Sequence, residues 1–140
     1  MRVFFDTSAF AKRYIQEAGS QQVLDLCGQA DALAVSVICL PEMISTLSRL
    51  VREEKFSDGQ YRATRKRVLA DLEDADICEI TPSVMTNTLG LLEGYRLRAM
   101  DALHLGCAMA YQPDVFVSAD RRQIGAAAGA GLTILDLSGA

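Results

Sequence analysis

The sequence predicts an α/β fold, a three-layer domain in which a five-stranded, mostly parallel sheet is flanked by helices. Short runs of branched and aromatic residues alternate with amphipathic helical stretches, and only three prolines interrupt the 140 residues. This alternation is typical of parallel strands joined by right-handed crossovers. Half of the residues are hydrophobic and 23% are charged, which is enough apolar material for a buried core and excludes a disordered chain. The length fits one domain, which we place at residues 1–140.

Five runs have the length and composition of buried strands. They are rich in Val, Ile, Leu and Phe, residues that favour β-structure. These runs span 3–5, 33–37, 77–80, 115–118 and 132–135.

Helical periodicity and end signals fill the intervals between the strands. After Pro41 the apolar residues recur at helical spacing through Val51, and Ser57 followed by Gln60 forms a capping-box pattern. We expect further helix N-caps at Ser20 and Ser83, and helix ends at Gly28 and Gly94.

Composition also narrows the functional class. No uncharged run reaches the ~18 residues of a membrane helix, and Asp6 falls where a signal peptide needs apolar residues, so we expect a cytoplasmic protein without a membrane segment. The four cysteines are far apart, which favours small buried thiols over a zinc site or disulfides. A net charge of −4 argues against a broad electrostatic surface for nucleic acid.

Two acidic residues follow predicted strands. In open α/β sheets the ligand crevice lies beyond the carboxyl ends of the strands, where Asp6 and Asp120 are expected. Helix capping is the alternative for both. Ser8 is a competing cap near Asp6, whereas Asp120 and Gln123 have the spacing of a capping box.

Two further acidic residues lie in predicted helices. Asp101 begins an almost wholly apolar stretch whose small residues, Gly106 among them, would let the helix approach the sheet closely. A buried carboxylate there needs a cation or several donors, unless it only caps the helix. His104, one turn later, is more often a hydrogen-bonded core residue than a ligand. Glu42 follows Pro41 in a first helical turn, where a solvated glutamate is also favoured.

The four carboxylates together indicate a metal site. If they converge without a cation, they repel one another and raise their own pKa values. Ligands that are all oxygen suit Mg²⁺ or Mn²⁺ rather than zinc. Such a site can activate water and stabilise charge on a scissile phosphate, and the metal removes the objection raised by the acidic net charge.

Four segments resemble the PIN domains of VapC-type toxin ribonucleases from VapBC toxin–antitoxin pairs. In chain order they are VFFDTSAFAKRY, PEMISTLSRL, RAMDALHLGCAMA and VSADRRQIGAAAGAGLTIL. The resemblance covers essentially the whole chain. It implies a five-stranded parallel sheet, an acidic pocket for Mg²⁺ or Mn²⁺, endonucleolytic cleavage of RNA, a small antitoxin partner and a homodimer.

The resemblance also implies the site residues. The acids of the family fall on Asp6, Glu42, Asp101 and Asp120, and a supporting hydroxyl falls on Ser118. We expect the first and third acids to be direct metal ligands, and the second and fourth to complete the shell, orient water or act as base. The chain departs from some family members at Gln123, where they carry a further carboxylate, so a single-metal site stays open.

The basic residues and two rival functions complete the expectations. Arg121 and Arg122 adjoin the fourth acid and are candidates for RNA binding, whereas the basic run 62–67 is interpreted as a solvated face. A non-catalytic PIN-like binding module is the main alternative function. A phosphoryl-transfer protein with Asp6 as nucleophile is less favoured, because such proteins carry a second Asp where this chain has Ser8.

Overall fold

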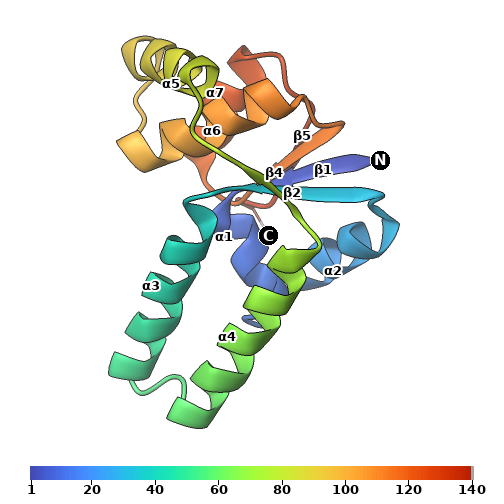
Figure 1. Cartoon of the computed structure of the whole chain (residues 1–140), viewed down its shortest axis with the longest axis vertical. Coiled ribbons are helices and arrows are strands. Elements are labelled where there is room, and N and C mark those ends of the chain that lie inside the picture. Colours follow the sequence, from blue (N-terminus) through green and yellow to red (C-terminus); the bar gives the residue numbers. More distant parts are fainter. Residues whose placement is uncertain (140) are drawn as a thin grey trace.

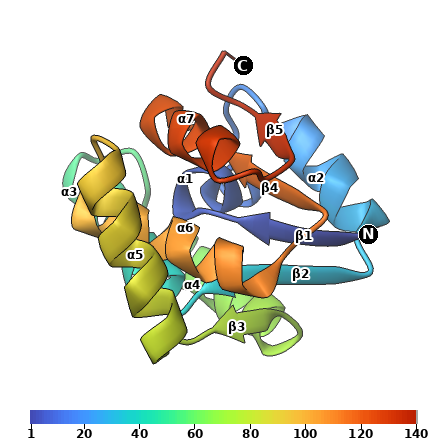
Figure 2. The ribbon, with the colours of Figure 1, turned by 90° about the horizontal axis from the view of Figure 1, so that it is seen from above.

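A computed structural model describes residues 1–139 and shows five parallel strands in one sheet. The strand order is β3-β2-β1-β4-β5, and every neighbouring pair is parallel (Figures 1 and 2). The strands are β1 (Arg2–Phe5), β2 (Ala32–Ser36), β3 (Asp76–Cys78), β4 (Val115–Ser118) and β5 (Ile134–Asp136). The predicted α/β class and the existence of all five strands are therefore confirmed.

Burial explains which strand boundaries were predictable. The central strand β1 is covered on both faces, so Val3, Phe4 and Phe5 are all fully buried and form a continuous apolar run. The edge strands β3 and β5 each pair with one neighbour and have three residues. The predicted runs 77–80 and 132–135 are shifted by one or two residues against them, because pairing register rather than composition sets their ends.

One face of the sheet is covered by the helices of residues 7–73. A core of buried residues from β1, β2 and β4 packs there against them, with Phe5 and Phe10 at 6.0 Å between ring centroids. In Figure 1, α3 and α4 extend away from the sheet as a helical hairpin. The elements are α1 (Thr7–Phe10), the 3-10 helix η1 (Ala11–Arg13), α2 (Ser20–Gln29), α3 (Cys39–Arg52) and α4 (Asp58–Glu73).

The other face is covered by α5 (Pro82–Gly94), α6 (Ala99–Tyr111) and α7 (Arg121–Gly129) (Figure 1). A second core lies beneath them, in which Phe4 and Phe116 stack at 5.9 Å. These two cores on opposite faces make the molecule three-layered, as predicted.

Helix ends show where local sequence signals compete. The capping box of Ser57 and Gln60 is present, as predicted. The N-cap of α2 is Gly19 rather than Ser20, and the N-cap of α5 is Thr81 rather than Ser83, because Thr81 precedes a proline at the first helical position. The expected stop at Gly94 is the last residue of α5, whereas α2 continues one residue beyond the expected stop at Gly28.

Gly106 lies where two helices approach closely, but its neighbour is α5 rather than the sheet. A Cβ atom added at Gly106 would lie 2.4 Å from Thr88 Oγ1 and 3.0 Å from the carbonyl oxygen of Val84. The expectation that this helix face lies against the sheet was wrong at this position, because α5 packs directly on Gly106. Close packing of α5 on α6 fixes the start of α6, where Asp101 lies.

In the part of the chain that the structure describes, no helix has the length and apolar character needed to cross a membrane.

Candidate active site

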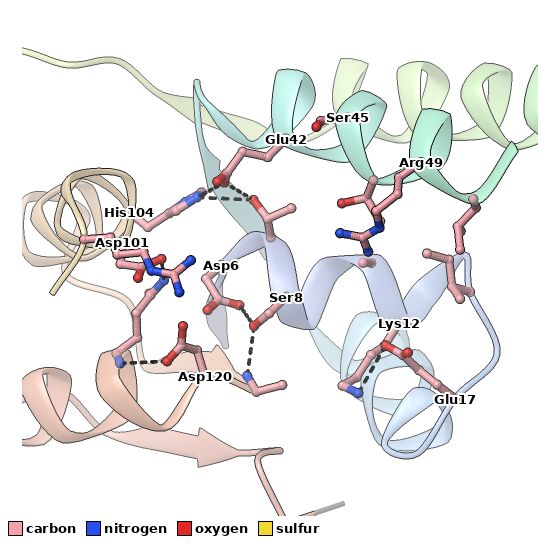
Figure 3. Close-up of a pocket in the computed structure, with 18 residues that line it drawn as sticks. Asp6, Ser8, Lys12, Glu17, Glu42, Ser45, Arg49, Asp101, His104 and Asp120 are labelled. Atoms are coloured by element: carbon pink, nitrogen blue, oxygen red, sulfur yellow. Dashed lines mark hydrogen bonds and ion pairs between the residues drawn. The ribbon is translucent and has the colours of Figure 1, made fainter. Parts of the chain in front are cut away.

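A pocket of about 700 Å³ lies at the carboxyl edge of the sheet and brings all four predicted acids together (Figure 3). Asp6 follows β1, and Asp120 lies two residues after β4. Glu42 comes from the first turn of α3, and Asp101 from the first turn of α6. In the strand order, β1 lies between β2 and β4, so the strand order reverses at β1. The four acids lie at this topological switch point, where open α/β sheets bind their ligands.

Asp6 is the most deeply buried of the acids. Its Oδ1 accepts hydrogen bonds from the hydroxyl of Ser8 at 2.7 Å and from the backbone N–H of Ala9 at 2.9 Å, and Ser118 donates to its Oδ2 at 2.5 Å. Asp6 therefore does cap α1, and the competing cap, Ser8, donates to it instead. Burial raises the pKa of Asp6 although these hydrogen bonds oppose the rise.

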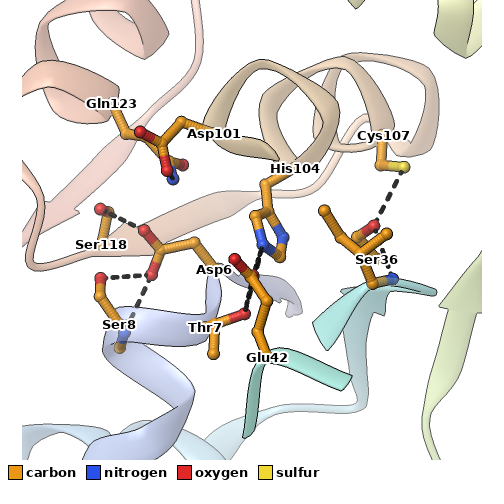
Figure 4. A network of polar contacts seen from close by, with 12 residues as sticks. Asp6, Thr7, Ser8, Ser36, Glu42, Asp101, His104, Cys107, Ser118 and Gln123 are labelled. Atoms are coloured by element: carbon orange, nitrogen blue, oxygen red, sulfur yellow. Dashed lines mark hydrogen bonds and ion pairs between the residues drawn. The ribbon is translucent and has the colours of Figure 1, made fainter. Parts of the chain in front are cut away.

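Glu42 is held through one carboxylate oxygen (Figure 4). The hydroxyl of Thr7 donates to Oε1 at 2.7 Å, and Nε2 of His104 is in close contact with the same oxygen. Burial raises the pKa of Glu42, but the hydrogen bonds from His104 and Thr7 outweigh it and leave the pKa below its ordinary value. The carboxylate is thus ionised and only half-buried.

Asp101 is the third residue of α6 and is not its N-cap, which is Arg98. The side-chain amide of Gln123 donates to Asp101 Oδ1 at 3.1 Å. Burial raises the pKa of Asp101, and the negative charge of Asp120 raises it further, while the Gln123 hydrogen bond opposes both. Burial is the main cause of this rise and the charge of Asp120 adds to it, so the expected mutual repulsion is seen at Asp101; at Glu42, where the pKa is lowered, the expectation was wrong.

Asp120 caps α7 and reaches the same pocket. Its Oδ1 accepts from the backbone N–H groups of Arg122 at 2.8 Å and Gln123 at 3.4 Å. The capping box is incomplete, because the Gln123 side chain contacts Asp101 instead. Ser118 connects this acid to the first, since its hydroxyl accepts from the Asp120 backbone N–H at 3.0 Å while donating to Asp6.

The chemistry of these side chains fits a hard divalent cation. Their donors are carboxylate oxygens, the ligands that Mg²⁺ and Mn²⁺ prefer. Within residues 1–139, no lysine or arginine forms an ion pair with any of the four acids. The same residues hold no cluster of three or more Asp, Glu, His or Cys side chains already arranged around a metal position. The carboxylates thus lie in one pocket, but each is turned toward protein donors.

The cations of the pocket differ from the predicted ones. Lys12, Arg49 and Arg98 line it, whereas Arg121 and Arg122 are exposed at the start of α7 and do not. The Lys12 Nζ is occupied by Glu17 at 3.2 Å and by the carbonyl of Ala18 at 2.6 Å.

Four side chains hold the acids, namely Thr7, Ser8, His104 and Gln123. Sequence reasoning did not consider Thr7 and did not assign the other three as donors to these acids, although it expected His104 to be a hydrogen-bonded core residue, as it is. The signal was present in their spacing, because Thr7 and Ser8 directly follow Asp6 and the other two lie three residues after an acid. On a helix such neighbours share a face, but which acid each contacts depends on tertiary packing. The side chain of Gln123, for example, contacts Asp101 rather than the acid three residues before it.

Comparison with known proteins identifies the family. The model of the PIN domain family matches residues 3–129. The chain is 32% identical over 123 residues to "Ribonuclease VapC45" of Mycobacterium tuberculosis, covering 86% of this chain and 85% of that protein.

Solved structures agree on the fold. A toxin–antitoxin complex from Klebsiella pneumoniae gives a TM-score of 0.70 at 16% identity, covering 95% of both chains. Mycobacterium tuberculosis VapC20, a toxin that cleaves the sarcin–ricin loop, gives 0.67 at 16% identity, covering 89% of this chain and 94% of that one. The family-model match over residues 3–129 and the 32% identity to a VapC ribonuclease establish that the chain belongs to the PIN domain family.

Proposed function

We propose that this chain is a VapC-type endoribonuclease, the toxin of a toxin–antitoxin pair, which cleaves RNA phosphodiester bonds with Mg²⁺ or Mn²⁺. The observation that carries the proposal is the convergence of four carboxylates from four elements in one pocket without a lysine or arginine paired to them among residues 1–139. The name of the relative, a VapC ribonuclease, supplies the substrate class. All of residues 1–140 would work as a single nuclease domain.

Asp6 and Asp101 would hold the cation, and Glu42 and Asp120 would complete its surroundings. A divalent cation supplies water activation and stabilises charge on the phosphate that is attacked. Ser8 and Ser118 fix the orientation of the Asp6 carboxylate, because Ser8 donates to Oδ1 and Ser118 donates to Oδ2. The ionised Glu42 is able to orient a water molecule and accept its proton as it attacks phosphorus.

RNA would bind along the pocket rim. Arg49 and Arg98 line the pocket and have exposed side chains, and Arg121 and Arg122 extend this basic rim beside Asp120. Guanidinium groups suit phosphate oxygens. A few arginines around an acidic centre are compatible with a net charge of −4.

Alanine substitutions test these arginines one at a time. If an arginine contacts a phosphate, its substitution by alanine should lower RNA affinity for all sequences. The same substitution should reduce the slope of log K against log salt by about 1. Arg62→Ala, on the exposed part of α4, is the matched control and should leave affinity unchanged. Unchanged affinity and salt slope in the Arg49 and Arg98 variants would show that RNA does not follow this rim.

An antitoxin partner would cover the same pocket in the cytoplasm, where the RNA substrate occurs. Beyond the acids, the pocket continues past the apolar side chains of Ala11, Ile15 and Leu50. A peptide with a cationic side chain for the acids and apolar side chains for this extension would fit it. The K. pneumoniae complex is a precedent for pairing with an antitoxin on this fold.

We also propose a homodimer formed through α5. Met85, Leu89 and Leu92 share one face of α5 by their spacing, and each is exposed. Leu89→Glu should then shift the molar mass measured by light scattering to that of a monomer, whereas Leu24→Glu, at another exposed leucine on α2, should not. A wild-type monomer at micromolar concentration would contradict the homodimer.

Cleavage of a mixed RNA pool tests the nuclease against the non-catalytic binding module. We expect cutting with Mg²⁺ or Mn²⁺, none with chelator, and inhibition by the cognate antitoxin. Folded, inhibitor-free protein that binds RNA but cuts it with neither metal would favour the binding module. A phosphorylated Asp6 with intact RNA would favour the phosphoryl-transfer alternative.

A further inference from the structure

His104 has a place in the pocket that core packing does not explain. It is the only histidine of the chain, and it is 1% exposed on α6, one turn after Asp101. Its Nδ1 is buried and has no hydrogen-bond partner among the described residues. An unpaired buried polar atom is unfavourable, and an apolar side chain of similar size would avoid it. Any specific role of His104 therefore depends on its other nitrogen, Nε2.

That nitrogen belongs to a three-membered contact. His104 Nε2 contacts Oε1 of Glu42, and the Thr7 hydroxyl lies 2.7 Å from this oxygen and 3.2 Å from Nε2 (Figure 4). The Glu42 carboxylate is an acceptor only, so Nε2 must carry a proton to bond to it. This excludes the tautomer protonated at Nδ1 alone.

The contact leaves the two oxygens of Glu42 unequal. Two donors converge on Oε1, whereas no donor within residues 1–139 forms a hydrogen bond with Oε2. The side chain of Glu42 is 30% exposed, so the free oxygen can be reached from the pocket. Without His104, only the Thr7 hydroxyl would restrict the rotatable bonds of this glutamate.

We propose that His104 is a positioning residue, which with Thr7 fixes Oε1 of Glu42 so that Oε2 alone serves the acidic pocket. The proposal rests on the proposed function, because it assigns that oxygen to the cation or to the attacking water. His104 itself touches neither RNA nor the reacting atoms. Donors behind a metal-binding carboxylate hold its orientation, and their loss commonly costs 10–100-fold in metal affinity or activity.

Nitrogen-15 NMR of the purified chain tests the contact independently of nuclease activity. As the only histidine, His104 needs no assignment by mutation. We expect Nε2 to carry a proton, and its signal to shift in Glu42→Gln. A tautomer protonated at Nδ1, or a signal insensitive to Glu42, would overturn the proposal even if the protein cuts RNA.

Three variants then test the consequence, by electron paramagnetic resonance of Mn²⁺ binding and by RNA cleavage. His104→Leu should weaken Mn²⁺ binding by about 10-fold or more and lower kcat with little change in KM, and His104→Gln, which retains an N–H donor, should restore much of both. Cys107→Ala is the matched control, because Cys107 is buried on the same helix but contacts Ser36 rather than Glu42.

The outcomes are distinguishable. Equal losses in the Leu and Gln variants, or none in a folded Leu variant, would overturn the positioning role. A wild-type protein with the expected tautomer that neither binds Mn²⁺ nor cuts RNA would refute the proposed function, and with it the role of Oε2, while the contact between His104 and Glu42 would stand.

Discussion

The buried carboxylate of Asp6 should destabilise the protein when no metal is bound. Burial raises its pKa in the folded state above that in the unfolded chain. The stability linked to its proton is therefore present at low pH and lost as the pH rises through the raised pKa. At pH 7.5 Asp6→Asn should accordingly unfold at a higher temperature than wild type in chelator. Asparagine caps a helix about as well as aspartate and can still bond to Ser8 and Ser118.

Metal should reverse this order. At a free Mn²⁺ concentration 100-fold above Kd, binding stabilises the wild type by about 2.7 kcal/mol. For a chain near 150 residues, 1 kcal/mol corresponds to about 3–4 °C in Tm, so the expected rise is roughly 8–11 °C. Asp6→Asn should show little of this rise.

Differential scanning fluorimetry with chelator and with a Mn²⁺ series measures both effects, and Asp25→Asn on the exposed face of α2 is the matched control. A metal-free Asp6→Asn that is less stable than wild type would refute the electrostatic argument. An unreduced Mn²⁺ shift in that variant would place the metal elsewhere.

Two further predictions concern packing and pH. Gly106→Ala forces a Cβ against Thr88 and should lower the free energy of unfolding by about 1–3 kcal/mol in chemical denaturation. Gly90→Ala on the neighbouring helix, where the Cβ has open space, should raise it by up to about 1 kcal/mol. Equal effects would mean that α5 and α6 are not closely packed. Because the pKa values of Asp6 and Asp101 are raised, protons should compete with Mn²⁺ at higher pH than for ordinary aspartates. Calorimetric Kd should rise as the pH falls from 7.5 to 5, and a constant Kd would contradict raised pKa values in the metal-free site.

The fold was largely predictable because the pattern of the sequence is local and regular. Central strands carry unbroken apolar runs, as in Val3 to Phe5, and these were located to within one residue. The ends of the edge strands were not, since they depend on pairing with a neighbour. Predictions of helix caps were wrong where two polar residues were available, as in α5, where Thr81 rather than Ser83 is the N-cap.

The convergence of the four acids on one pocket was predictable, whereas the donors that hold them were not. The acids follow strands or begin helices, and the rule for the carboxyl edge of a parallel sheet brings such positions together. The partner of His104 lies 62 positions away on α3, and no local pattern encodes that contact. The arginines at the pocket rim were unpredictable for the same reason, because the packing of α3 and α6 brings Arg49 and Arg98 to the pocket.

Cleavage of one defined RNA by four variants with a single carboxylate changed to an amide tests the shared acidic centre most directly. Asp6→Asn, Glu42→Gln, Asp101→Asn and Asp120→Asn should each lower Mn²⁺-dependent cutting, with the largest losses at Asp6 and Asp101, while Asp25→Asn should cut like the wild type. Undiminished cutting by folded Asp6→Asn or Asp101→Asn would contradict a metal centre built on these acids.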